Sequence, residues 1–525
     1  MVTGSALRLV GDILRINART LPGQPALTHA GHTLTYAELN AHVNRVAHAL
    51  VASGVQPSDR VAVLAKNSLA YFALYFATAK IGAMLVPLNY WNRAAQHAAV
   101  LTDVTPRLLF NDPEYAQIAS EALALADETD PQLIELDPWG ADPAEDDSPW
   151  QRFVGQTQDT TDPDVSIDPA EGHMILYTSG TTGQAKGAVL SHERTVSDAI
   201  SMAAVLGVRQ SDIYGNWFTP FHVGNWDHQK FFLVMGAHVV LYPQFDAAVA
   251  LKAIERHRIT ALLTVPVMIQ QMMDLPRFAE TDLASLRLVY FGAYDPSGIM
   301  DRAAAALGAH ENRIQMVHCY GLTEGGCIVA ACPADRVLEK WGTIGRPIPG
   351  VEVRLVDDGR AVGIGEPGEI LVRGPIMNGY WNRPEETRAT LADGWLHTGD
   401  VAVADAEGFL RIVDRKKDMI RSGGQNVYSK EIEDCLANHP AIAEAAVIGL
   451  PDPVYEEAVT AVVVARDSDV DHDTLRTDVM TYVRERLAGY NTPRQVIIVD
   501  ALPKNTLGKI LKPELRATYG SMFDR

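Results

Sequence analysis

Cysteine is scarce in this sequence, and basic residues are fewer than acidic ones. Only four cysteines occur among 525 residues, at positions 319, 327, 332 and 435, and no two share a C-x-x-C spacing. We therefore expect reduced, packed thiols and neither a disulfide framework nor a structural zinc site. With 45 Lys and Arg against 65 Asp and Glu, the formal net charge is -20, which argues against broad nucleic-acid binding. Local backbone donors can still bind an anion such as phosphate.

A long uninterrupted apolar run is also missing. Two arginines and an aspartate interrupt the apolar residues near the N-terminus, so we expect no secretory signal peptide. The apolar stretch Leu69–Leu88 contains Lys80, Gly82 and Pro87, which predicts a helix followed by a strand and not a membrane span. A cytoplasmic protein with no integral membrane contact is the expectation.

What the sequence does contain is a globular composition in a chain too long for one core. Hydrophobic residues make up 47% and charged residues 21%, as in folded proteins, and chains of this length divide into two or more domains. Helical and strand patterns alternate in the first third. Thr35 and Glu38 form a capping box before a helix, and Val61–Leu64 and Met84–Val86 are typical of buried strands. Such alternation predicts a layered α/β domain with parallel strands.

Later regions differ in character. Residues 127–169 are rich in Asp, Glu and Pro, and we expect exposed loop and edge structure there. Residues 351–372 predict a small β subdomain, and the pattern after Arg415 is that of a compact α+β unit. The fold class is therefore α/β: a large layered α/β N-terminal domain over residues 1–416, with a β-rich subdomain at about 340–412, and a smaller α+β C-terminal domain over 417–525.

A loop rich in glycine and hydroxyl residues follows the predicted strand Ile175–Tyr177. Over residues 178–187 it runs Thr-Ser-Gly-Thr-Thr-Gly-Gln-Ala-Lys-Gly. Glycine lets several N–H groups point at one cluster of oxygens, hydroxyls add donors, and lysine adds positive charge. The loop therefore favours nucleotide phosphates, although the Walker A spacing is absent and a flexible surface loop is the alternative. A second glycine pattern, at 363–368, contains a proline and opens no helix, so we interpret it as a turn.

This loop is one of five segments that occur in a known order. They are Tyr177–Gly187, Tyr320–Glu324, Trp395–Asp400, Asp414–Ile420 and Pro503–Ile510. In this order they resemble the signature motifs of the acyl-adenylate-forming superfamily, which includes acyl-CoA synthetases, nonribosomal peptide adenylation domains and beetle luciferases. The resemblance runs from about residue 34 to residue 512 and is nearest to acyl-CoA synthetases.

The resemblance implies a nucleotide site. Tyr320 is expected to stack on adenine, and Asp400, supported by Arg415, to accept hydrogen bonds from the ribose. Taken alone, a core aromatic and a turn aspartate would explain these residues equally well, so the assignment depends on the motif order. Tyr294 stands where the family usually has a small residue, which is expected to narrow or reshape the site. The implied ATP and AMP contacts are Thr178, Ser179, Gly180, Thr181, Thr182, Gly183, Lys186, Gly292, Ala293, Tyr294, Tyr320, Gly321, Thr323, Asp400 and Arg415.

The implied chemistry joins a carboxylate to the α-phosphate of ATP. Two anions must be held in line while the developing charge is neutralised. By resemblance, Lys509 contacts both groups and stabilises that charge, and Thr323 contacts phosphate. Glu324, helped by Thr178, is expected to hold Mg²⁺, a hard cation that prefers oxygen ligands. In the family the C-terminal domain is mobile and rotates between the two half-reactions, and Lys417 matches its hinge.

Two further sets of residues follow from the resemblance. His222 resembles an aromatic gate between the acyl and thiol tunnels, with a hydrogen-bonded core histidine as the alternative. Glycines near residue 423 would let the pantetheine arm of CoA pass close to the backbone. The implied acyl site comprises Trp217, His222, Val223, Asn225, Trp226, Phe291, Gly321 and Gly325, and the implied CoA site comprises Arg421, Ser422, Gly423 and Gly424. Asn491 replaces a lysine of many relatives, which leaves the nucleotide end of CoA unassigned.

These features predict an AMP-forming acid–CoA ligase that uses ATP, Mg²⁺ and coenzyme A. Acyl-adenylate formation with release of pyrophosphate is followed by thioester formation with release of AMP. Three alternatives stay open: transfer to an amine or a carrier-protein thiol, a luciferase-like oxidoreductase, and a binding protein that has lost catalysis. The aromatic residues of the acyl set favour a bulky, aryl or medium-length acid. A homodimer is the working hypothesis for the assembly, and no nucleic-acid partner is expected.

Overall fold

The computed structural model describes residues 7–127, 129–137, 148–178, 185–292, 298–467, 470–504 and 510–520. The chain divides into two compact units. The first comprises Met1–Ala293, Ala303–Val353 and Val372–Leu396, and the second comprises Tyr294–Arg302, Arg354–Leu371 and His397–Arg525. Among the described residues, no helix combines the length and the apolar character that a membrane crossing requires.

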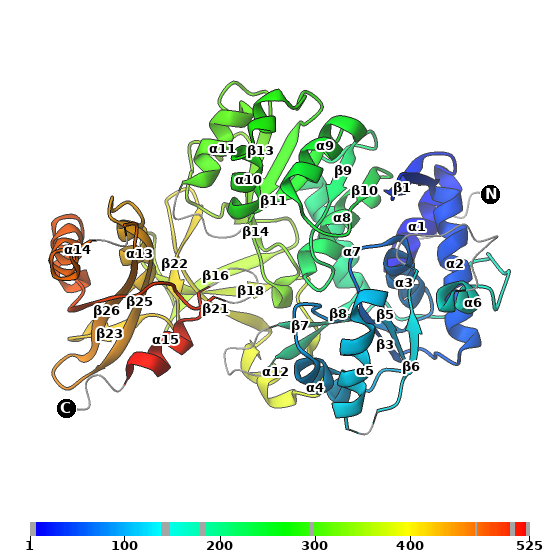
Figure 1. Cartoon of the computed structure of the whole chain (residues 1–525), viewed down its shortest axis with the longest axis horizontal. Helices are drawn as coiled ribbons and strands as arrows, with labels where there is room; N and C mark the ends of the chain where they lie inside the picture. The colour runs from blue at the N-terminus through cyan, green and yellow to red at the C-terminus, as the bar shows by residue number, and fades with distance from the viewer. Residues whose placement is uncertain are drawn as a thin grey trace. The chain divides into compact units, whose positions relative to one another are not determined.

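A nine-stranded sheet forms one half of the first unit (Figure 1). Its central strands, from β13 to β1, run parallel, and antiparallel strands close both edges. The order is β15 (Arg346–Pro347), β14 (Ala330–Cys332), β13 (Gln315–Tyr320), β12 (Leu288–Phe291), β11 (Ala261–Thr264), β9 (Ile213–Asn216), β10 (His238–Leu241), β1 (Pro25–His29) and β2 (His32–Thr35). The parallel layered α/β architecture predicted from the sequence is confirmed.

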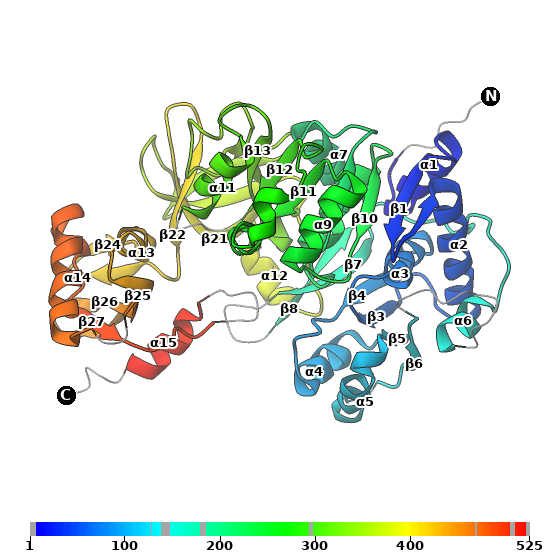
Figure 2. The same ribbon diagram turned by 45° about the horizontal axis from the view of Figure 1, so that its top comes forward.

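A seven-stranded sheet forms the other half of the first unit. It combines a parallel core with an antiparallel edge, where β7 and β8 form a hairpin and β19 adds to β8. The order is β19 (Gly379–Tyr380), β8 (Lys186–Ser191), β7 (Gly172–Thr178), β4 (Met84–Pro87), β3 (Arg60–Leu64), β5 (Leu108–Asn111) and β6 (Gln132–Glu135). In Figures 1 and 2, α4 and α5 lie side by side next to this sheet, and their apolar faces join its core.

Helices of the first unit begin where the sequence supplies a cap. The Thr35 hydroxyl oxygen accepts a hydrogen bond from the Glu38 N–H, and the Glu38 carboxylate accepts one from the Thr35 N–H, so the predicted capping box starts α2. The helix ends before Gly54, whose φ of 84° suits glycine. The helices are α1 (Val10–Thr20), α2 (Tyr36–Ala52), α3 (Leu69–Lys80), α4 (Ala94–Val104), α5 (Ala116–Leu125), α6 (Pro149–Val154), α7 (His192–Val205), α8 (Val223–Leu233), α9 (Ala247–His257), α10 (Pro266–Met273) and α12 (Pro384–Thr390), while α11 (Ile299–Leu307) crosses the division between units.

The described parts of the acidic region, residues 127, 129–137 and 148–169, contain a strand and a helix. β6 is an edge strand, as expected, but α6 is a helix that the sequence analysis missed. Trp150 and Phe153 of α6 are buried, and their rings lie 6.1 and 5.2 Å from that of Phe110. Burial of these two aromatic side chains stabilises a helix in a segment whose acidic composition predicts loop structure.

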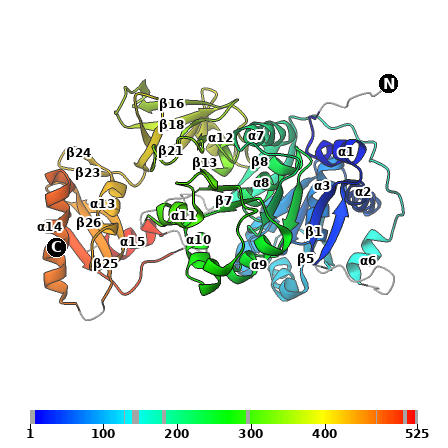
Figure 3. The same ribbon diagram turned by 90° about the horizontal axis from the view of Figure 1, so that it is seen from above.

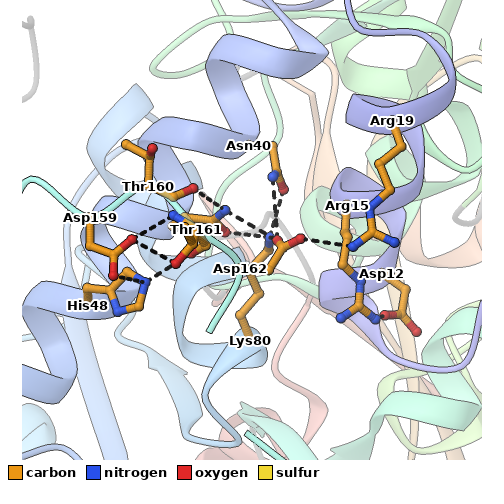
Figure 4. Close-up of polar contacts among 11 residues, drawn as sticks. Asp12, Arg15, Arg19, Asn40, His48, Lys80, Asp159, Thr160, Thr161 and Asp162 are labelled. Atoms are coloured by element: carbon orange, nitrogen blue, oxygen red, sulfur yellow. Dashed lines mark hydrogen bonds and ion pairs between the residues drawn. The ribbon is translucent and has the colours of Figure 1, made fainter. Parts of the chain in front are cut away.

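Lys80, at the end of α3, fixes the same region to the helices (Figure 4). Its ammonium group donates hydrogen bonds of 2.7, 2.6 and 2.7 Å to Asn40, Asn44 and Asp162. Burial lowers the pKa of Lys80 to about 8, while the neighbouring carboxylate opposes that shift. A lysine inside the predicted apolar stretch 69–88 is therefore a buried anchor for residue 162.

A third sheet of six strands carries the predicted β-rich subdomain. Gly365, in the turn between β17 and β18, has a φ of 77°, so the glycine pattern at 363–368 is a turn as predicted. The sheet consists of β17 (Arg360–Ala361), β16 (Glu352–Asp357), β18 (Gly368–Arg373), β21 (Trp395–Ala404) and β20 (Leu391–Ala392), with β22 (Leu410–Arg415) paired to β21.

The C-terminal part of the second unit is an α+β structure, as predicted. Figure 3 shows α13 and α14 beside β25 and β26, and the buried face of α14 supplies Leu475, Val479 and Val483 to their shared core. The sheet order is β24 (Gln425–Val427), β23 (Ile420–Ser422), β26 (Glu456–Ala465) and β25 (Ile442–Asp452), with β27 (Gln495–Ile498) paired to β26. The helices are α13 (Ser429–Ala437), α14 (His472–Arg486) and α15 (Lys512–Tyr519).

Candidate active site

The predicted phosphate loop connects β7 to β8. Thr178 ends β7, Lys186 begins β8, and the two residues are direct antiparallel partners. The hairpin therefore holds a hydroxyl and an ammonium group at the same end of two strands. The other predicted loop residues, Ser179, Gly180, Thr181, Thr182 and Gly183, lie outside the described residues.

Glu324 lies opposite this hairpin, on the short 3-10 helix Thr323–Gly325. Its carboxylate accepts a hydrogen bond of 3.4 Å from the Thr178 hydroxyl and one of 2.9 Å from the Tyr380 hydroxyl. The Lys186 ammonium group lies 5.4 Å from the centroid of the Tyr380 ring. Burial, and then the negative charge of Glu324, raise the pKa of Tyr380 above its usual range, so this hydroxyl keeps its proton. The structure thus brings Thr178, Lys186 and Glu324 together.

Tyr380 is the functional candidate that the sequence analysis missed. It belongs to β19, which pairs with β8 so that Tyr380 faces Ala188 across the ladder. The Met377 N–H also donates 2.8 Å to the Glu324 carbonyl. Because Tyr380 and Glu324 are far apart in sequence, only long-range strand pairing brings them together, and no local motif could have shown it.

The ends of β12 and β13 present the next group of predicted residues. Phe291 ends β12 and stacks on His318 of β13, with centroids 4.7 Å apart. Tyr320 ends β13 and is half-buried. A side chain at Gly321 would lie 1.5 Å from the Cys327 carbonyl oxygen, so only glycine fits there. Gly292 follows β12, whereas Ala293 and Tyr294 lie outside the described residues.

The predicted acyl residues cluster at the start of α8. His222 is exposed and caps the helix by accepting a 3.0 Å hydrogen bond from the Gly224 N–H, and Val223 is buried. Asn225 donates 2.7 Å to Asn67, and the Trp226 indole donates 2.6 Å to the Pro220 carbonyl. The acyl contacts of these residues stay predictions.

The two tryptophans and the second glycine of the acyl set are also packed within the protein. Trp226 stacks on Tyr75, with centroids 4.3 Å apart, and Trp217 lies 6.2 Å from Phe245 by the same measure. A side chain at Gly325 would lie 2.5 Å from Leu322. Protein contacts therefore account for the burial of both tryptophans.

A cluster of buried charges lies between α7 and α8. Asp227 pairs with Arg194 at 3.2 Å and with Lys230 at 2.5 Å. Asp198, Asp227 and Cys327 have the spacing of metal ligands, and they are the only such trio among the described residues. Arg194 and Lys230 already pair with the Asp227 carboxylate, and burial raises the pKa of Asp198 well above its usual value. The cluster is therefore better suited to fixing α7 against α8 than to binding a metal.

A shallow cavity of about 390 Å³ lies near the start of α7. None of the predicted site residues lines it. The lining residues are Ser191, Glu193, Arg194, Ser197, Gly350, Gly374, Pro375, Ile376 and Asn378.

In the second unit, Asp400 and Arg415 are direct partners in the β21–β22 ladder. The Arg415 Nε lies 2.9 Å from the Asp400 carboxylate, which is buried. Glu369, which the sequence analysis missed, accepts hydrogen bonds from the Gly399 N–H at 3.2 Å and from Lys416 at 2.9 Å. Burial alone would raise the pKa of Glu369, but Lys416 and His397 hold it below its usual value. The predicted ribose carboxylate thus stands in a fixed, charged setting.

The predicted CoA residues surround the turn between β23 and β24. Arg421 and Ser422 belong to β23, and Gly423 and Gly424 have φ values of 59° and 77°, which favour glycine. A side chain at position 423 would lie 3.2 Å from the Tyr455 ring.

Of the two lysines predicted to act in catalysis, the structure describes Lys417 but not Lys509. Lys417 is exposed in the turn that links β22 to β23. Lys509 lies outside the described residues, next to an antiparallel bridge between Lys504 and Ile510. The hinge and catalytic roles of these two lysines stay predictions.

This chain is similar to known proteins along most of its length. Residues 14–381 match the family AMP-binding enzyme, and residues 431–509 match the AMP-binding enzyme C-terminal domain. A feruloyl-CoA synthase from Amycolatopsis is 37% identical over 96% of this chain and 97% of its own. An indoleacetate–CoA ligase from Aromatoleum aromaticum is 38% identical over 94% of this chain and 95% of its own.

A solved structure extends the likeness to the fold. ATP-bound MatB from Rhodopseudomonas palustris is 30% identical, with a TM-score of 0.84 over 98% of this chain and 99% of that one. The family match covers well over half of the sequence, and the relatives align along nearly all of it. Together with the Thr178, Lys186 and Glu324 cluster, these matches show that the chain belongs to the AMP-binding enzyme family.

Proposed function

We propose that the protein is an ATP-dependent carboxylic acid–CoA ligase. In the first step the acid attacks the α-phosphate of ATP and pyrophosphate leaves. In the second step the CoA thiol attacks the acyl adenylate and AMP leaves. Family membership and relatives named as CoA ligases support this reaction over transfer to an amine and over a luciferase-like oxidation.

The cluster of Thr178, Lys186, Glu324 and Tyr380 is the observation that carries the proposal. It places one carboxylate, two hydroxyls and one ammonium group around the end of a hairpin. Carboxylate and hydroxyl oxygens are the donors that Mg²⁺ prefers, so these residues fit that ion. Bound there, Mg²⁺ would supply positive charge to the triphosphate. Lys186 adds a second positive charge for the phosphate oxygens.

In the first step the chain's own groups act as binding and orienting elements. Glu324, which accepts a hydrogen bond from Tyr380, is assigned to binding Mg²⁺. Asp400, paired with Arg415, is the acceptor assigned to the ribose hydroxyls. Lys509 is assigned to the reacting carboxylate and α-phosphate, where its charge would offset the negative charge that develops. Holding both reactants in line is the larger part of such catalysis.

For the second step we assign the C-terminal domain, residues 417–525, to a rotation about Lys417. The first domain, residues 1–416, would keep the acyl adenylate. Gly424, in the turn between β23 and β24, would leave room for a pantetheine arm, because a side chain there would meet nothing within 4 Å. A cytoplasmic location and a homodimer remain predictions of the sequence analysis.

An aromatic acid is the proposed substrate class. Two of the relatives are named for feruloyl and indoleacetate, and both names denote acids with an aromatic ring. The described residues of the acyl set also include aromatic side chains: Phe291, which stacks on His318, and Trp226 near the start of α8, which stacks on Tyr75. Flat apolar side chains favour flat apolar ligands.

The test is acid-dependent exchange of pyrophosphate into ATP with a panel of aryl and alkyl acids, followed by CoA-dependent release of AMP. We expect exchange without CoA and AMP release only with CoA. Lys509→Ala should abolish exchange yet spare thioester formation from supplied acyl adenylate, and Lys417→Pro should do the reverse. An amide product formed without CoA, or equal loss of both steps in both variants, would refute the scheme.

A further inference from the structure

Asp103 lies in the last turn of α4, a position that does not favour an acid. The C-terminus of a helix carries partial negative charge, so a carboxylate there is disfavoured unless other groups offset it. Only 15% of the Asp103 side chain is exposed, and removing the charge from water adds a further cost. A carboxylate at this position therefore depends on partners that offset both costs.

The first partner is Tyr177 of β7, the residue directly before Thr178. Its phenol donates a hydrogen bond of 2.5 Å to the Asp103 Oδ2. Burial, and then this hydrogen bond, raise the pKa of Tyr177 above its usual range, so the phenol keeps the proton that it donates. Successive side chains of a strand point to opposite faces. Asp103 therefore holds β7 from the face opposite to that on which Thr178 meets Glu324.

Gly187, the partner of Tyr177 in the β7–β8 ladder, makes room for this contact. A side chain at position 187 would lie 3.1 Å from the Tyr177 ring. The bare backbone of β8 therefore lies against the tyrosine ring. Lys186 precedes Gly187 and pairs directly with Thr178. By holding this ring, Asp103 fixes the two strand ends from which the predicted phosphate loop extends.

The remaining partners of Asp103 come from the chain that follows β19. Arg383 donates a hydrogen bond of 3.3 Å from Nη1 to the Asp103 Oδ1, which completes an ion pair. The Trp381 indole and the Asn382 amide donate hydrogen bonds of 3.1 and 3.0 Å to the Asp103 carbonyl. The Trp381 N–H in turn donates one of 2.7 Å to the Gly187 carbonyl. Asp103 therefore holds the end of β19 as well as the hairpin.

We propose that Asp103 is a positioning residue for adenylation, which fixes the hairpin and β19 in the arrangement that binds the terminal phosphates of ATP. This inference rests on the proposed function, which assigns the hairpin and Glu324 to the triphosphate and its metal ion. Asp103 acts through Tyr177 and Arg383, since it lies on the face of β7 away from Glu324. Groups that are already in place before the ligand arrives lose less freedom when it binds, so affinity for the triphosphate rises.

The experiment measures the binding of MgATP and of AMP to the whole chain by titration calorimetry. AMP lacks the two terminal phosphates, so its binding does not depend on the groups assigned to them. Asp103→Ala removes both side-chain contacts and should raise the Kd of MgATP about tenfold or more, while the Kd of AMP changes by less than about twofold. A purely structural role would raise both dissociation constants together and leave their ratio unchanged.

Tyr177→Phe tests the same contact from the other side and keeps the aromatic ring. It should raise the Kd of MgATP relative to that of AMP, by a smaller factor than Asp103→Ala does. The double variant should bind MgATP as Asp103→Ala does, because a phenol without its carboxylate partner has little left to lose. Additive losses in the double variant would show that the two groups act separately, and would contradict the proposal. If Asp103→Ala does not fold, the ratio measured with Tyr177→Phe decides the question.

Asp162→Ala is the matched control, because Asp162 also forms an ion pair, with Lys80 at 2.7 Å, in the same unit. It should lower the temperature of unfolding and leave the ratio of the two dissociation constants unchanged. A wild-type protein that binds MgATP, with a ratio that Asp103→Ala and Tyr177→Phe do not alter, would overturn this inference alone. A wild-type protein that binds no MgATP would overturn the proposed function, and the inference with it.

Discussion

Gly321→Ala is the substitution whose effect the structure defines most sharply. The added Cβ would lie 1.5 Å from the Cys327 carbonyl oxygen and 2.8 Å from the Ile328 Cα. Contacts of a Cβ below 3.0 Å are essentially never found. The first distance must therefore lengthen from 1.5 to 3.0 Å, and the obstacle is backbone, which cannot rotate away as a side chain can.

The consequence reaches the proposed active site because Gly321 stands between Tyr320 and the 3-10 helix of Glu324. A displacement of about 1 Å in a positioning element can cost about 100-fold in rate. We expect pyrophosphate exchange to fall by at least that factor. Forcing a methyl group into a packed site also costs about 1–3 kcal/mol of stability, so the first unit should unfold at a lower temperature.

The matched control is Gly23→Ala, since a Cβ at position 23 meets nothing within 4 Å and that glycine does not need a positive φ. Exchange assays and thermal unfolding, performed on both variants, separate a local clash from a general effect of adding a methyl group. If Gly321→Ala were as active and as stable as Gly23→Ala, the close backbone approach would have no importance, and the reasoning from it would be refuted.

Three further predictions follow from other contacts. Tyr380→Phe removes a hydrogen bond to the Glu324 carboxylate, which is worth about 1.5–3 kcal/mol, so exchange should need more Mg²⁺; an unaltered Mg²⁺ titration would contradict this. Asp400→Asn weakens the pair with Arg415 and should raise the KM for ATP about tenfold, whereas an unchanged KM would exclude a ribose contact. Because the pKa of Lys80 falls from 10.5 to about 8 on folding, the unfolded chain holds more protons between these pH values. The unfolding free energy should therefore rise by about 3 kcal/mol from pH 8 to 10.5 relative to Lys80→Met; parallel pH curves for the two proteins would disprove it.

Local patterns in the sequence predicted much of this fold. The capping box of α2, the buried strands β3 and β4 and the turn at 363–368 each follow from residues within one short window. The helix α6 was missed because its two buried aromatics, Trp150 and Phe153, occur in a segment whose overall composition is acidic and rich in proline. Composition averages over such a segment, whereas packing depends on single side chains.

In the candidate site, too, residues within one short segment could be predicted from the sequence, whereas residues brought together by long-range pairing could not. Thr178 and Lys186 were found because one hairpin loop holds them both. Tyr380 and Glu369 were not found, since each reaches its partner through sheet pairing between distant segments.

The segment 377–380, which ends in β19, is expected to spread the stabilising effect of ATP binding through the first unit. Within four residues it donates from Met377 to the Glu324 carbonyl, from Asn378 to the Val189 carbonyl, and from Tyr380 to the Glu324 carboxylate. It thus links the turn after β13 in the nine-stranded sheet to β8 in the seven-stranded sheet. Binding of ATP and its metal ion at Glu324 would stabilise these contacts between the two sheets. ATP should therefore protect the whole first unit, and not only the phosphate loop, against thermal unfolding and proteolysis.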